Sequence, residues 1–187
     1  MAETEYPLRI YLIRHATPDW KRKDIPYDIP PGPPLIDQGE QEAAQLGEYI
    51  RQAGVRKLYH SPLERAMRTA QISAAAAGIQ TEEELALAEW RSGEGEAHIA
   101  ARFCPVWERA VVESRSMGPI GLVTHGGPVR FLLDRLGLPA SVMEAHRKLY
   151  DSGNPLPPAG AWMAERASAD DPWRLELVFI PGAEKVL

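Results

Sequence analysis

Short continuous apolar runs alternate along this chain with longer stretches whose apolar residues recur every three or four positions. Short apolar runs bounded by turn residues indicate buried strands, and the three- to four-residue spacing indicates amphipathic helices. The runs predict strands over residues 8–13, 55–59 and 120–124, and a terminal hairpin over 161–166 and 174–180. Helices are predicted over 38–53, 62–77 and 97–116 and after Pro128.

Several boundaries follow from capping residues and helix breakers. Asp37 is expected to cap the first helix, with Glu40 three residues later completing a capping box. Ser61 is expected as the N-cap of the second helix with Pro62 at its first position, and Gly78 ends that helix. Pro105 predicts a break in the third helix. An edge strand is expected near Leu85, Ala86 and Leu87.

The alternation of strands and helices predicts an α/β fold with a mainly parallel sheet covered on both faces. The chain has 187 residues, a length that suits one domain with a single core spanning residues 1–187. Two stretches rich in proline and glycine, residues 25–34 and 153–160, read as loops because neither separates two domain-sized segments.

Composition narrows the classes of function. With 44% hydrophobic and 25% charged residues the chain has the balance of a soluble globular protein, and a net charge of −5 argues against a nucleic-acid partner. No apolar stretch approaches a membrane span, and one cysteine permits no intrachain disulfide. The acidic start at Glu3, Thr4 and Glu5 is unlike a signal peptide, so we expect a cytoplasmic protein.

Arginine and histidine side chains cluster at three turns that each follow a predicted strand. Arg14 and His15 follow the first, Arg65 lies just inside the second helix, and His125 precedes Gly126 after the strand 120–124. Such points converge at one edge of an α/β sheet, where ligands bind. Each residue alone fits an ordinary surface or turn role, but two arginines and two histidines together predict a cationic pocket for a phosphoryl group.

Three motifs resemble those of the histidine phosphatase superfamily, in the branch that includes cofactor-dependent phosphoglycerate mutase. Arg14-His15-Ala16 is similar to its arginine-histidine-glycine signature, residues 61–66 with Thr69-Ala70 to its second motif, and residues 124–127 to its third. Order and spacing match along roughly the first 140 residues. The resemblance implies a phosphoglycerate mutase-like, three-layer α/β/α sandwich with a mixed, mainly parallel sheet.

The resemblance also implies a role for each residue. His15 would accept the phosphoryl group, and Arg14, Arg65 and His125 would hold its oxygens. Glu89 would act as general acid and base; Glu94 and Glu96 are its competitors, whereas residues 82–84 suit a solvated face. Because these cations supply the positive field, no metal and no cofactor is expected.

The first motif departs from the family pattern at three places. Ala16 replaces the usual glycine, Thr17 replaces the usual glutamate or glutamine, and Lys21 follows Trp20 where many relatives have asparagine. Lys21 could reach a phosphate oxygen, although a loop lysine is more often exposed. None of these changes removes His15, Arg14, Arg65 or His125, which together form the expected phosphoryl clamp. They do leave the identity of the substrate undetermined.

We favour a phosphomonoesterase acting on a small phosphorylated substrate. The alternatives are a mutase of the same family, although longer insertions typical of mutases are lacking, and a non-catalytic protein that binds a phosphorylated ligand. A metal site built from the five histidines is a weaker reading, since no pair has zinc-motif spacing. Trp20, Trp90 and the loop 25–34 could wall the pocket, residues 151–160 could form a second rim, and the terminal hairpin could pair two copies in a homodimer.

Overall fold

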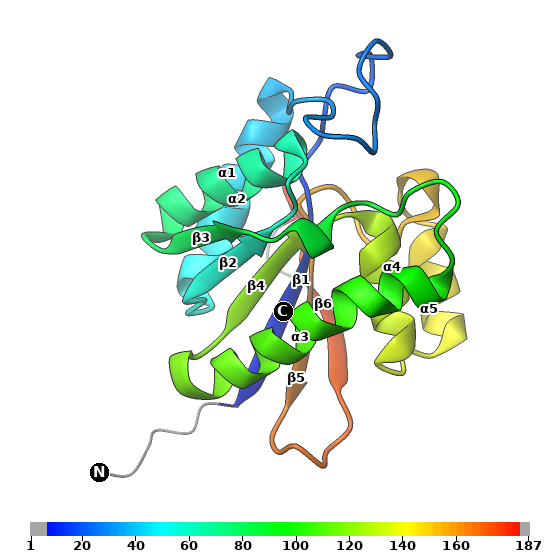
Figure 1. The fold of residues 1–187 in the computed structure, drawn as a ribbon. Helices are drawn as coiled ribbons and strands as arrows, with labels where there is room; N and C mark the ends of the chain where they lie inside the picture. The colour runs from blue at the N-terminus through cyan, green and yellow to red at the C-terminus, as the bar shows by residue number, and fades with distance from the viewer. Residues whose placement is uncertain (1–6, 184–187) are drawn as a thin grey trace.

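The computed structural model describes residues 7–183, and the acidic start at residues 3–5 and both ends of the expected 1–187 domain lie outside that range. The structure is built on one six-stranded sheet with the strand order β3-β2-β4-β1-β5-β6 (Figure 1). The strands and helices, including two short 3-10 turns, are β1 Leu8–Arg14, α1 Asp37–Gln52, β2 Lys57–His60, α2 Glu64–Ala77, β3 Gln80–Glu83, η1 Leu85–Leu87, α3 Glu96–Met117, β4 Ile120–Thr124, α4 Gly126–Arg135, α5 Ala140–Arg147, η2 Asp151–Gly153, β5 Ala161–Arg166 and β6 Arg174–Phe179.

The sheet is mixed and mainly parallel. β3, β2, β4 and β1 pair in parallel, whereas β5 and β6 are antiparallel to their neighbours. All five residues of β4, which lies between β2 and β1, are buried. A strand covered on both faces reads as a continuous apolar run, so this central strand was identifiable from sequence. The predicted fold class is confirmed.

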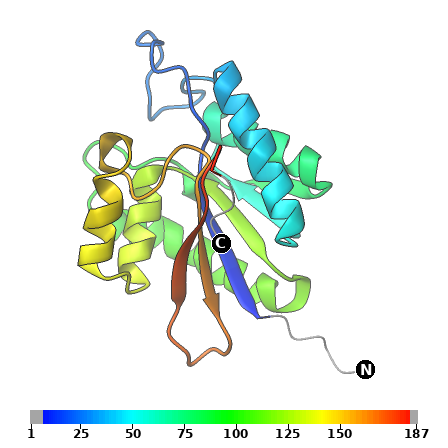
Figure 2. The same ribbon diagram turned by 180° about the vertical axis from the view of Figure 1, so that it is seen from behind.

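Two apolar clusters pack on opposite faces of the sheet. One joins Ile10, Leu12 and Leu122 to apolar residues of α3 and α4. The other joins Ile13 and Val123 to apolar residues of α1 and α2. Figure 1 shows α3 on the near face, and Figure 2, seen from behind, shows α1 on the opposite one. Helices on both faces of one sheet make the expected three-layer α/β/α arrangement.

No helix of residues 7–183 has the length and apolar character to cross a membrane.

Two predicted caps are wrong, because tertiary contacts use those residues differently. α1 begins at Asp37 itself, with Ile36 as N-cap and no side-chain cap; the Ile36 amide donates instead to the carbonyl of Thr17 at 3.2 Å. α2 begins at Glu64 after the N-cap Leu63. Ser61 lies before that cap, with its hydroxyl bonded to the Leu63 amide and to a histidine ring.

Three further predictions about the elements are corrected. The edge strand is Gln80–Glu83, paired with β2, and the expected segment is the 3-10 turn η1; the true strand is polar and mostly exposed, so it carries no apolar pattern. α3 continues through Pro105, because the buried neighbours Phe103 and Val106 hold it against the sheet. α5 was not predicted, since Met143 is its one buried residue.

Candidate active site

The three motifs meet where β1, β4 and β2 end side by side. Arg14 pairs with Thr124 across the β1–β4 ladder, and the His15 amide donates to the Thr124 carbonyl at 2.9 Å. On the other side of β4, the Ser61 amide donates to the Val123 carbonyl at 3.0 Å. The chain therefore leaves all three strands at one sheet edge and brings the predicted histidines and arginines together there.

The His15 side chain is buried and held in one tautomer. Its Nδ1 lies 2.7 Å from the Ala16 carbonyl oxygen, which can only accept a hydrogen bond, so Nδ1 carries the proton. Nε2 is then the nitrogen with the free lone pair, and the Tyr27 hydroxyl lies 3.4 Å from it. Burial, followed by the charges of Arg65 and Arg14, holds the pKa of His15 well below its ordinary value. His15 is therefore a neutral imidazole with Nε2 available.

His125 lies beside His15, with 5.1 Å between the ring centroids. Its Nε2 is 2.8 Å from the Ser61 hydroxyl, and its buried Nδ1 has no hydrogen-bond partner among the described residues. Burial and then the charge of Arg65 also hold the pKa of His125 well below its ordinary value. The Ser61 hydroxyl thus fixes the ring from one side and leaves the other nitrogen free for a ligand.

The two arginines are almost fully buried and differ in their partners. Arg65 donates from Nη1 to the Tyr27 carbonyl at 2.7 Å, and its guanidinium lies 3.8 Å from the centre of the Tyr27 ring. Arg14 donates from both Nη atoms to the carboxylate of Asp151, at 2.6 and 2.7 Å, and from Nη1 to the Leu156 carbonyl. These contacts orient both guanidinium groups before any ligand arrives.

Four buried nitrogen atoms of this cluster have no partner within residues 7–183: Arg14 Nε, Arg65 Nε and Nη2, and His125 Nδ1. A buried donor without an acceptor costs about 1–3 kcal/mol. The three guanidinium nitrogens are such donors, and around one point they favour a ligand with several acceptor atoms and negative charge. A tetrahedral oxyanion has that chemistry.

Glu89 lies next to this cluster, with Oε2 3.8 Å from His125 Nδ1. Its Oε1 accepts from the Trp90 amide at 2.8 Å. Burial raises the pKa of Glu89, although that amide and the nearby arginines act in the opposite direction. The side chain therefore keeps a proton to higher pH than an exposed glutamate, which suits a general acid.

Arg102 of α3 anchors the backbone that carries Glu89. Its guanidinium donates to the carbonyls of Ala86, Ala88 and Glu89 at 2.6, 2.8 and 3.0 Å. The same guanidinium holds the carboxylate of Glu94 at 2.9 Å, and this bond lowers the pKa of Glu94. Glu94 is thereby kept ionised and pointed away from the cluster, so its geometry suits an acid less well than that of Glu89.

The remaining candidates lie outside the cluster. Lys21 is exposed on the loop after β1 and does not line the cavity beside His15. Glu96 is exposed at the start of α3. The sequence also offers His60, after the second strand, as a residue of the pocket wall; it is buried, its Nδ1 contacts the Ser61 carbonyl at 2.9 Å, and it does not line the cavity. Within the described residues, no three His, Cys, Asp or Glu side chains gather in a way that could hold a metal ion.

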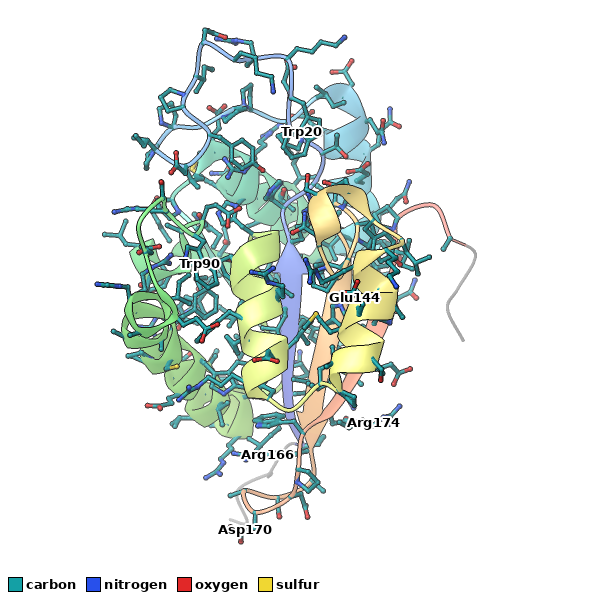
Figure 3. All side chains as sticks on the ribbon, turned by 90° about the vertical axis from the view of Figure 1, so that its right-hand side faces the viewer. Trp20, Trp90, Glu144, Arg166, Asp170 and Arg174 are labelled. Carbon is teal, nitrogen blue, oxygen red and sulfur yellow. The ribbon has the colours of Figure 1, made fainter. Side chains whose placement is uncertain are left out.

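A cavity of about 200 Å³ opens above His15. Trp20 and Tyr27 stack on one wall, with ring centroids 5.5 Å apart. Trp90 points elsewhere, packing edge-on against Phe131; the two tryptophans are labelled in Figure 3. The residues that line the cavity are Arg14, His15, Trp20, Tyr27, Glu89, Gly126, Ser152 and Asn154.

Sequence reasoning missed several residues that shape this site. Tyr27 was included only as part of a proline-rich loop, and Asp151 and Asn154 only as part of a second rim. The sequence predicts Ser61 only as a cap, and it gives no signal for Arg102. Only the sharp turn at residues 151–154, rich in Asp, Ser, Gly and Asn, gave a signal, because such residues favour turns that carry ligand contacts.

A sequence model of the histidine phosphatase superfamily, branch 1, matches residues 10–99. Proteins named "Probable phosphoglycerate mutase GpmB" from Salmonella arizonae and Salmonella newport are each 39% identical over 74 residues, which cover 38% of this chain and 33% of the relative. The match thus spans about a third of the length of these curated relatives.

Solved structures share the fold over most of the chain. A mycobacterial glucosyl-3-phosphoglycerate phosphatase superposes with a TM-score of 0.70 at 21% identity, covering 90% of this chain and 97% of that one. A phosphoglycerate mutase from Bacillus anthracis gives a TM-score of 0.73 at 14% identity, covering 95% of each chain. At these identities the likeness establishes the architecture, which is that of the phosphoglycerate mutase-like fold.

Proposed function

Because this chain belongs to branch 1 of the histidine phosphatase superfamily, we propose that it is a phosphomonoesterase that works through a phosphohistidine on His15. The observation that carries the proposal is the free Nε2 lone pair of a neutral His15, set among the unpartnered nitrogens of Arg14, Arg65 and His125. A nucleophile and a preorganised anion-holding set at one point are what phosphoryl transfer requires.

The first step forms the phosphoenzyme. His15 Nε2 attacks the phosphorus atom, an N–P bond forms and the P–O bond to the substrate body breaks. Arg14, Arg65 and His125 hold the phosphoryl oxygens while negative charge spreads over them. Glu89, which burial keeps protonated to higher pH than an exposed glutamate, gives its proton to the departing alkoxide.

The second step releases inorganic phosphate. Glu89, now ionised, takes a proton from a water molecule whose oxygen attacks the phosphorus atom, and the N–P bond breaks. The electron pair returns to His15 Nε2, and the Ala16 carbonyl keeps the ring in the same tautomer throughout. The enzyme is thereby restored, with one ester converted into an alcohol and phosphate.

The test is to trap the intermediate. Rapid quench with a labelled phosphate monoester should give an acid-labile, base-stable phosphoenzyme and inorganic phosphate. His15→Ala should abolish both, whereas His98→Ala should not, because His98 is exposed outside the site. Isomerisation of a phosphoglycerate without phosphate release would instead favour a mutase, and tight phosphate binding without turnover of any ester would favour a binding protein.

A further inference from the structure

A carboxylate lies beside the candidate site, paired with Arg14 and next in sequence to Ser152, two residues that both line the cavity. Asp151 accepts from both Nη atoms of Arg14, yet the Asp151 side chain is 42% exposed while that of Arg14 is 2% exposed. The carboxylate therefore stands between the buried guanidinium and the solvent. The Arg14 guanidinium also holds the pKa of Asp151 below its ordinary value, so the carboxylate is negative at neutral pH.

The segment 151–154 is fixed in place. The side-chain amide and backbone amide of Asn154 donate to the Asp151 carbonyl at 3.0 and 3.1 Å, and Arg147 donates to the Gly153 carbonyl at 2.9 Å. The segment packs so closely on α4 that a Cβ atom at Gly126 would lie 1.7 Å from Asn154 Oδ1. These contacts fix the backbone that carries Asp151 beside the site.

The rest of the cavity offers no site for a second anion. Its lining includes the stacked pair of Trp20 and Tyr27, which is uncharged, and Ser152 and Asn154, which are polar but neutral. The acidic residue that lines it is Glu89, which adds no cation. The basic residues that line the cavity are Arg14 and His15. The fork of Arg14 is occupied by Asp151, and His15 is neutral.

We infer that, if the proposed phosphatase function holds, Asp151 determines specificity by selecting phosphate monoesters whose organic body is uncharged. A body with hydroxyl or aromatic groups can lie against Trp20, Tyr27 and Asn154. A carboxylate on the substrate body would instead face Asp151, and the described residues that line the cavity offer it no cation beyond Arg14, whose Nη atoms Asp151 already holds. For two like charges about 7 Å apart at an effective dielectric constant near 40, the repulsion corresponds to about tenfold in a rate or binding constant. This is an upper limit, because the Arg14 guanidinium offsets part of the Asp151 charge.

The test compares two esters with the same three-carbon skeleton, glycerol 3-phosphate and 3-phosphoglycerate, which differ by a hydroxymethyl group in place of a carboxylate. The expected kcat/KM, measured by phosphate release, is higher for glycerol 3-phosphate by up to about tenfold. Asp151→Asn should bring this ratio of kcat/KM values close to one. Because the ratio is taken within one variant, any loss common to both esters from a displaced Arg14 cancels.

Asp170→Asn is the matched control. It removes the same charge from the turn between β5 and β6, at the opposite end of the molecule from Trp20 (Figure 3), and should leave the ratio unchanged. A second measurement needs no variant: added potassium chloride should narrow the ratio in the wild-type protein, because salt screens charges at an exposed mouth.

The outcomes separate the two levels of the argument. Phosphate release with equal kcat/KM for the two esters, or a ratio that neither Asp151→Asn nor salt changes, would overturn the inference and leave the phosphatase in place. If neither ester nor an aromatic phosphate such as p-nitrophenyl phosphate gives phosphate or a phosphoenzyme, the proposed function falls and this inference falls with it.

Discussion

Replacing Arg65 by methionine should lower kcat/KM strongly without lowering the thermal stability of the protein. The wild-type side chain is fully buried and carries two nitrogens, Nε and Nη2, without a partner among the described residues. Methionine fills a similar volume with a flexible apolar chain, so Arg65→Met removes the charge and these donors without leaving a large cavity. The contacts of the guanidinium with the Tyr27 carbonyl and ring disappear as well.

The expected loss of activity is large. One preorganised donor to a transition-state oxyanion contributes about 3 kcal/mol, so two donors set an upper limit of about 6 kcal/mol. Arg65→Met should therefore lower kcat/KM by a factor of about 10² to 10⁴, since about 1.4 kcal/mol corresponds to tenfold. Arg65→Lys keeps the charge but not the planar fork, and should recover only part of that loss.

Unlike the activity, the stability of Arg65→Met should not fall. Burial lowers the pKa of Arg65, and the neighbouring charge of Arg14 lowers it further. Keeping this side chain charged therefore costs folding free energy when no ligand is bound. Tyr27 and Glu89 offset only part of this penalty, and replacing such a buried charge by an apolar group of similar size removes it. The Tm of Arg65→Met should equal or exceed that of the wild-type protein in phosphate-free buffer.

Thermal unfolding and phosphate release measured on the same preparations would check both effects. Arg68→Met is the matched control, because Arg68 lies one turn further along α2, where it is half-exposed and paired with Glu40 at 2.8 Å. It should change the free energy of unfolding by less than about 1 kcal/mol and leave kcat/KM nearly unchanged. A loss below tenfold for Arg65→Met, with Tm preserved, would refute the contact between Arg65 and the transition state.

Three further predictions concern the acid, its support and the rim. Glu89→Gln should lower kcat/KM for alkyl phosphates about 10²-fold or more and affect p-nitrophenyl phosphate much less; because burial raises the pKa of Glu89, wild-type kcat/KM for alkyl phosphates should decline only above the ordinary glutamate range, and the variant should lack that decline. Equal slowing of both esters would count against this role. Arg102→Met should lower kcat/KM for alkyl phosphates about tenfold and that for p-nitrophenyl phosphate less, because the backbone of Glu89 loses its anchor. An equal effect on both esters would show that the anchor is dispensable. Gly126→Ala should destabilise the protein by about 1–3 kcal/mol through overpacking against Asn154, whereas Gly95→Ala, whose Cβ would meet nothing nearer than 3.9 Å, should not lower Tm to the same extent.

The elements that the sequence predicted correctly are those whose signal is local. β1 and β4 are continuous apolar runs because both of their faces are covered, and Gly78 ends α2 because it adopts a left-handed conformation with φ 69°. β3 and α5 bury too few apolar side chains to produce a pattern. β3 forms because the edge of β2 is available for pairing, and α5 forms against α4. Only the assembled fold provides these surfaces.

The caps show how tertiary contacts override a local rule. Ser61 before Pro62 has the local signature of an N-cap, but its hydroxyl is drawn to His125, which is 64 residues away in the chain. Asp37 has the signature of a capping box, but the helix begins at Asp37 itself, one residue earlier than the pattern predicts, and the Ile36 amide donates to the Thr17 carbonyl. Ser61 keeps a local bond from the Leu63 amide, but in both cases a hydrogen bond to a distant segment accompanies the shifted helix start.

The sequence alone determined which chemistry could gather at the sheet edge, because residue type and position after a strand are local properties. It supplied Arg14, His15, Arg65, His125 and Glu89 as candidates and predicted the parallel sheet that would bring them together. Only the tertiary structure decided which ring nitrogen of His15 is free, that Tyr27 supports Arg65, that Arg102 holds the Glu89 segment and that Asp151 faces Arg14. Orientation, burial and pairing depend on atoms from several segments at once, and no pattern in one segment encodes them.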